Sequence, residues 1–164
     1  MGRYLFAGNM NTMGTGYCTI LTELGIELTA QGNEVWILGH KYNKGPHNFP
    51  FTVIPSDVNW FPAQGANLSQ VLKIDAGILA MDIPRIGNML HYGKKLAEWK
   101  IPTIGLFPVE ATPILPIWAK RLGELDGLAV ISQFGKRALL SEHGLDATWS
   151  VSYTHLTLPT ILLV

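Results

Sequence analysis

Short apolar runs alternate with longer amphipathic stretches along most of this chain. The buried strands of a parallel sheet consist of continuous apolar runs, whereas amphipathic helices repeat apolar residues at intervals of three and four positions. The first pattern predicts strands over Arg3–Gly8, Glu34–Gly39, Phe51–Ile54, Asp75–Met81, Pro102–Val109 and Leu128–Ile131. The second predicts helices over Gly16–Gln31, Asn67–Lys73, Ile86–Trp99, Pro116–Leu122 and the stretch from Ser132 to Gly144. Strands that alternate with helices predict a parallel sheet covered on both faces.

The segment Asp126–Gly144 is the clearest strand-to-helix unit. Ser132 follows an apolar run and can accept a hydrogen bond from the first free N–H groups of the helix. Gly144 can adopt the left-handed conformation that ends a helix, and Gly32 is expected to close the first helix in the same way. We therefore predict an α/β fold with a doubly wound, Rossmann-like and mostly parallel sheet.

The loop at residues 9–19, NMNTMGTGYCT, joins the first predicted strand to the first predicted helix. Gly14 and Gly16 would let the backbone approach a phosphate group, and the N–H groups at the start of the helix would face it. We predict that Gly14, Thr15 and Gly16 form a phosphate-binding loop. The alternative is that the loop is only a tight turn of a doubly wound sheet.

With the segments Leu5–Gly39 and Pro108–Asp126, the unit at Asp126–Gly144 resembles the amino-terminal domain of GT-B-fold glycosyltransferases, above all their large retaining, metal-independent family. The resemblance covers about residues 3–149. It implies transfer of a hexosyl group from a nucleotide-diphosphate sugar to an unknown acceptor hydroxyl. It further implies that the donor domain is missing, that no catalytic residue lies here, and that neither a metal nor a cofactor other than the nucleotide-sugar co-substrate is needed.

Two acidic residues follow predicted strands. Asp82 comes after Asp75–Met81, and Glu110 comes after Pro102–Val109. Because the carboxyl ends of parallel strands meet at one edge of the sheet, where ligands collect, both are candidates to contact the acceptor. Asn11, in the loop described above, is a third candidate. The alternatives are that Asp82 caps the next helix and that Glu110 is a solvated loop carboxylate.

Two other functional classes remain as alternatives. In an NAD-binding domain of an oxidoreductase or epimerase, a third small residue would stand where Thr19 is, and an acid for the ribose would end the second strand, which instead reads Leu38-Gly39-His40. Both departures argue against NAD. A flavodoxin-like receiver or binding module would place acids at the first strand, and residues 3–11 contain none.

The amino-acid composition limits the classes of partner and the location that can be expected. Twelve basic and twelve acidic residues cancel, which argues against nucleic acid as a partner but leaves peripheral association with a membrane open. The single cysteine, Cys18, rules out an internal disulfide framework and fits a cytoplasmic location. We expect it on the buried face of the first helix. The start of the chain does not read as a signal peptide, and no apolar run approaches the roughly 20 residues of a spanning helix.

The last residues do not fit the preceding pattern. Residues 151–160 read VSYTHLTLPT, and a DNA string that encodes them is similar to a transposon end joined to a sequencing adapter. We therefore expect one domain at residues 1–150 and a non-native tail at residues 151–164. The alternative is a natural strand.

Overall fold

The computed structural model describes residues 1–11, 15–45, 47–57, 61–86 and 101–150. Three predictions lie wholly or mainly outside these ranges: Gly14 in the loop, the helix at Ile86–Trp99, and the tail at residues 151–164.

The described strands form one sheet of seven parallel strands in the order β3-β2-β1-β4-β5-β6-β7, which confirms the predicted doubly wound, Rossmann-like α/β fold. The chain first moves outward from β1 to β3, then returns to the other side of β1 and continues outward from β4 to β7. The order therefore reverses between β1 and β4. The bounds are β1 Arg3–Asn9, β2 Glu34–His40, β3 Thr52–Ser56, β4 Ala76–Ala80, β5 Thr103–Phe107, β6 Gly127–Val130 and β7 Trp149–Ser150.

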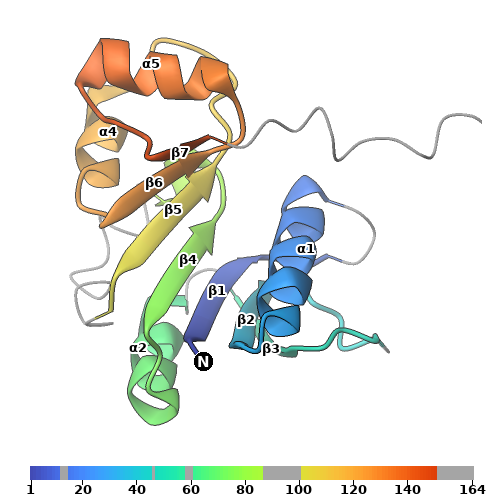
Figure 1. Cartoon of the computed structure of the whole chain (residues 1–164). Helices are drawn as coiled ribbons and strands as arrows, with labels where there is room; N and C mark the ends of the chain where they lie inside the picture. The colour runs from blue at the N-terminus through green and yellow to red at the C-terminus, as the bar shows by residue number, and fades with distance from the viewer. Residues whose placement is uncertain (12–14, 46, 58–60, 87–100, 151–164) are drawn as a thin grey trace, which may run out of the picture.

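Helices lie on both faces of the sheet, but unequally. Successive side chains of a strand point to opposite faces, so Phe6 in β1 packs with Leu21 of α1 while its neighbour Leu5 joins the core on the other face. That second core includes Leu122 of α4 and Leu139 of α5. Figure 1 shows α1 beside β1 and β2, away from α4 and α5. The helices are α1 Gly16–Ala30, α2 Phe61–Leu72, α4 Pro116–Leu122 and α5 Gln133–His143.

The helix ends confirm the predicted roles of Ser132, Gly144 and Gly32 and add a cap at Thr15 that was not predicted. The Ser132 hydroxyl accepts a hydrogen bond from the N–H of Gly135 at 3.0 Å, and the Thr15 hydroxyl does the same for Cys18 at 3.2 Å. Gly144 ends α5 with φ +64°, and Gly32 follows α1 with φ +84°, so both use the left-handed conformation that glycine tolerates best.

Most bounds differ from the predicted ones by one or two residues, and a helix and two strands differ in ways that have a physical reason. The helix expected at Asn67 begins at Phe61, because a proline at its second residue is tolerated in a first turn. The third strand extends to Ser56 through Pro55, which is possible because β3 is an edge strand. The short strand β7 was not predicted, and two residues carry too little alternation to reveal a strand.

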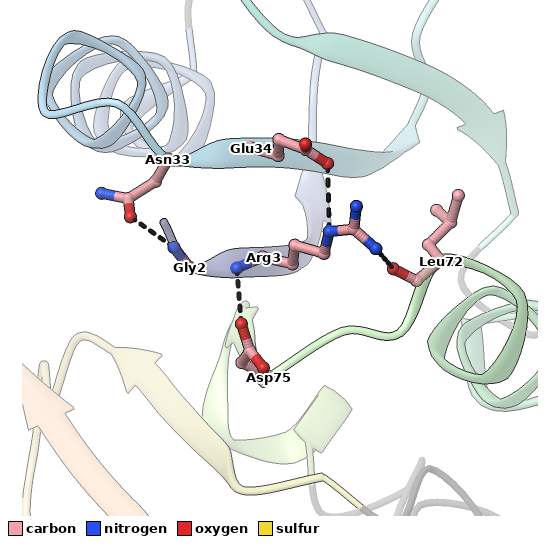
Figure 2. A network of polar contacts seen from close by, with 6 residues as sticks. All are labelled: Gly2, Arg3, Asn33, Glu34, Leu72 and Asp75. Atoms are coloured by element: carbon pink, nitrogen blue, oxygen red, sulfur yellow. Dashed lines mark hydrogen bonds and ion pairs between the residues drawn. The ribbon is translucent and has the colours of Figure 1, made fainter.

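The amino-terminal edge of the sheet is held by a polar network around Arg3, shown in Figure 2. The N–H of Arg3 donates to the Asp75 carboxylate at 2.8 Å, and its guanidinium donates to the carbonyl of Leu72 at 2.9 Å and lies 3.2 Å from the Glu34 carboxylate. The network joins the starts of β1 and β2 to the end of α2 and the entry to β4.

Gly8 is the point of closest approach between β1, β4 and α1. A Cβ atom at Gly8 would lie 2.6 Å from the carbonyl oxygen of Ala80 and 2.7 Å from a methyl group of Leu21. Ala80 is also its partner in the β1–β4 register. Any side chain at position 8 would therefore push β4 or α1 away.

We expect Gly8→Ala to lower the free energy of unfolding by about 1–3 kcal/mol, because the backbone of β4 must shift to admit the methyl group. The matched control is Gly123→Ala at the end of α4, where φ is −66° and the nearest atom would be 3.4 Å away. The control should keep or slightly raise stability. Denaturant unfolding of both variants measures this, and equal stability of the two would contradict the packing described.

Candidate functional site

A crevice opens at the carboxyl ends of β1, β2 and β4, with a volume of about 70 Å³. It lies where the strand order reverses, which is the usual ligand-binding position of an open α/β sheet. The connections that follow β1 and β4 lead to opposite sides of the sheet from this point. The lining residues are Gly8, Asn9, Tyr17, His40, Ala80, Met81, Asp82 and Arg85.

Asp82 forms one wall of the crevice and links two elements. The hydroxyl of Tyr17, in the first turn of α1, donates a hydrogen bond to the Asp82 carboxylate at 2.7 Å. Arg85 follows in the helical turn at residues 83–86, with its guanidinium 3.9 Å from the same carboxylate. The contact is long and the Arg85 side chain is 52% exposed, so this charge remains accessible to an anion at the rim.

His40 forms the opposite wall as the last residue of β2. Burial lowers the pKa of its imidazole below the ordinary value of 6.5, and the charges of Arg85 and Lys41 lower that pKa further, while Asp57 opposes them. His40 is therefore neutral at neutral pH and can donate one hydrogen bond and accept another. Its backbone carbonyl is already used, because it accepts from the N–H of Met10 at 2.8 Å.

The structure brings only part of the predicted site to this crevice. Asp82 lines it directly, and Thr15 and Gly16 lie at the start of α1, next to Tyr17. The Thr15 side chain caps α1. Asn11 lies beyond the end of β1, where its N–H donates to the side chain of Asn9 at 3.0 Å. The predicted role of Thr15, Gly16 and Asn11 as ligand contacts stays a prediction.

Glu110 lies in a second cavity of about 360 Å³, at the carboxyl ends of β4 and β5. Trp118, Pro108 and Asp82 line the same cavity, so Asp82 borders both hollows. The Glu110 side chain is exposed. The structure thus places the two predicted carboxylates along one edge of the sheet, in adjoining hollows.

Sequence reasoning missed Tyr17, His40 and Arg85 as site residues. A usable signal existed for the last two, because His40 ends a predicted strand and Arg85 comes shortly after another. The carboxyl ends of the first, second and fourth strands meet only once the strand order is known. Tyr17 had no such signal, since its role depends on the direction in which α1 crosses the sheet.

Other reactive groups lie away from this chemistry. Cys18 is buried against the sheet, as predicted, and burial raises the pKa of its thiol despite an opposing hydrogen bond with Thr22. A protonated, buried thiol is a poor nucleophile. Among the described residues, no three His, Cys, Asp or Glu side chains gather in a way that could hold a metal ion. No helix within the described ranges is long and apolar enough to cross a membrane.

Comparison with known proteins gives similarity in structure but none in sequence families. No family model and no curated protein matches the chain. A solved structure of the binary complex of leucoanthocyanidin reductase with NADPH, from Vitis vinifera, matches with 14% sequence identity and a TM-score of 0.46. The match covers 97% of this chain and 55% of that chain, so this chain spans about half the length of the reductase.

This finding corrects the predicted family. The matched structure is a reductase with NADPH and not a glycosyltransferase, so the predictions of a GT-B domain and of a retaining hexosyltransferase are wrong. The expectation that no cofactor is involved is contradicted by the same structure. The physical reason is that the features behind the resemblance are a serine cap, a terminal glycine and a glycine-containing turn. These features serve any strand-to-helix unit of a doubly wound sheet.

The lowered pKa of His40 predicts that the fold loses stability in mild acid. Below pH 6.5 the unfolded chain binds a proton at His40 that the folded chain does not, so the free energy of unfolding falls as the pH is lowered. Thermal unfolding between about pH 7.5 and about pH 5.5 should show this loss.

The His40→Asn variant should reduce the dependence on pH, because asparagine does not titrate. The same replacement at the exposed His47 keeps His40 and should leave the loss in place. A pH profile that His40→Asn does not flatten would show that another group controls the acid response.

Proposed function

We propose that this chain is the nucleotide-binding domain of an oxidoreductase and that the crevice between β1 and β4 takes part in binding NADP(H). The observation that carries the proposal is the crevice at the reversal of the strand order. In doubly wound sheets of this order, dinucleotides bind across the carboxyl edge at that point. The crevice has a volume of about 70 Å³, so it has room for only a phosphate-sized part of the cofactor.

The amino end of α1 supports a diphosphate at this position. The helix begins at Gly16, and Tyr17 in its first turn lines the crevice. The start of a helix carries partial positive charge, and the first turn of α1 itself contains no acidic residue, although Tyr17 in that turn holds the Asp82 carboxylate at the crevice wall. We therefore assign the diphosphate of the cofactor to the space between α1 and the ends of β1 and β4.

The residues at the end of β2 favour binding of a cofactor whose ribose carries a 2′-phosphate. An NAD site uses an acidic residue there to bind the ribose hydroxyls, whereas an NADP site uses a nearby arginine to accommodate the 2′-phosphate. Here β2 ends at His40, Lys41 follows, and Arg85 lines the same crevice as His40. The missing acid, which argues against NAD, is thus consistent with NADP.

The second cavity supports the other half of a dinucleotide. A doubly wound sheet consists of two mononucleotide-binding halves, and the cavity beside Glu110 lies on the half that begins with β4. Its volume of about 360 Å³ and the side chain of Trp118 suit a planar ring. When bound, the nicotinamide supplies or accepts a hydride. The residues of this chain hold and orient the cofactor. The hydrogen bond from Tyr17 holds the Asp82 side chain in place between the crevice and the second cavity.

Calorimetric titration of the chain with NADPH and with NADH tests the proposal. We expect NADPH to bind at least about tenfold more tightly, because a charge-assisted hydrogen bond to the 2′-phosphate contributes about 1.5–3 kcal/mol. The Arg85→Ala variant should bind NADPH and NADH about equally. The matched control is Arg137→Ala, an exposed arginine on α5. It should leave the affinities unchanged.

Absence of NADPH binding to a normally folded chain would contradict the proposed function. A preference for NADH would contradict the assignment of Arg85 and Lys41 while leaving a dinucleotide site in place. Adding 2′,5′-ADP as a competitor separates these outcomes, because it carries the ribose phosphate without the nicotinamide.

A further inference from the structure

The face of the sheet that carries α1 is only half covered in the described structure. The helices α2, α4 and α5 pack on the other face, while α1 packs on β1 and β2. Figure 1 shows α1 alone on its side of β4, β5 and β6. A groove of about 500 Å³ runs there, between α1 and the strands, and we call it the α1 groove.

The floor of the α1 groove is a continuous apolar surface. Ile78 in β4 lies beside Ile104 in β5 in the strand register, and Ile131 and Trp149 extend the surface across β6 and β7. On the wall formed by α1, Ile26 is 40% exposed, and Trp149 at the far end is 50% exposed. Exposed apolar surface of this extent, bordered by charges, is typical of a site that another element covers.

Among the described residues that line the α1 groove, the charged side chains are all negative. They are Glu23 and Glu27, which lie on α1 four residues apart, on the same side of the helix. Like charges at that spacing repel each other. Within the described residues neither forms an ion pair, although Glu27 accepts a hydrogen bond from Gln31 at 2.7 Å. A cationic partner would relieve this repulsion.

We propose that the α1 groove docks an amphipathic helix of another protein, with an apolar face on the sheet and lysine or arginine residues along the edge that meets α1. A helix fits because one that lies beside α1 would complete the layer that α1 begins and cover the half-buried isoleucines. The charge complementarity with Glu23 and Glu27 fixes the orientation of the helix and selects against acidic partners. This surface is separate from the crevice proposed to bind NADP(H).

The test uses synthetic helical peptides with a fluorescent label and the full chain. The first peptide has leucines along one face and lysines along one edge of that face. The second replaces the lysines with glutamates, and the third replaces the leucines with serines. Fluorescence anisotropy should show binding of the lysine peptide, at least about tenfold weaker binding of the glutamate peptide, and no binding of the serine peptide.

The double variant Glu23→Lys with Glu27→Lys should reverse the preference, so that it binds the glutamate peptide more tightly than the lysine peptide. Ile26→Asp should weaken binding of both by placing a charge on the apolar wall. The control is Glu124→Lys, whose side chain is 44% exposed and outside the groove, and it should bind like the unaltered chain. Circular dichroism confirms that each variant is folded.

Several outcomes would overturn the proposal. One is that the folded chain binds no peptide, and another is that charge reversal at Glu23 and Glu27 has no more effect than reversal at Glu124. A third is that analytical ultracentrifugation shows a dimer that Ile26→Asp dissociates. The groove would then be covered by a second copy of this chain and not by a different protein.

Discussion

The close parallel pairing of β1 with β4 is the constraint on which the rest of the structure depends. The two strands are adjacent in the sheet but far apart in the chain, and α1 packs over β1 where the backbones of Gly8 and Ala80 lie side by side. Only a glycine at position 8 allows that approach. Because the chain leaves this pair in opposite directions, the carboxyl edge between them is where the crevice lies.

The polar residues at the two edges of the sheet have different roles. At the amino-terminal edge, the Arg3 network joins β1, β2, α2 and β4 through groups that are partly exposed, so its contribution is mainly to position these elements. At the carboxyl-terminal edge, Tyr17 and Asp82 make a single strong contact, while His40 stays neutral and Arg85 remains half exposed. Polar groups that are held in place along a crevice suit recognition of a ligand.

The sequence was sufficient for the fold class and much less so for the site. Apolar runs and helix ends such as Ser132 and Gly144 are local signals, and they predicted the alternation of strands and helices because burial on both faces needs that pattern. The strand order is not local. Without it, His40 and Arg85 are two unrelated polar residues, and only the pairing of β1 with both β2 and β4 makes them neighbours.

The wrong family assignment has a related cause. The segments that suggested a glycosyltransferase contain the capping and turn residues that every doubly wound sheet requires, so they indicate architecture more strongly than chemistry. The proposed function depends instead on the residues around the crevice, above all the lack of an acid at the end of β2 and the presence of Lys41 and Arg85. These residues are informative only once their positions in the sheet are known.

The most direct test is to map the binding of NADPH onto the backbone by heteronuclear NMR of the isotope-labelled chain. The account predicts that the largest changes in amide shifts fall at the carboxyl ends of β1, β2 and β4, around Asn9, His40 and Asp82. Changes confined to the opposite edge around Arg3 and Asp75, or no changes at saturating NADPH, would contradict it.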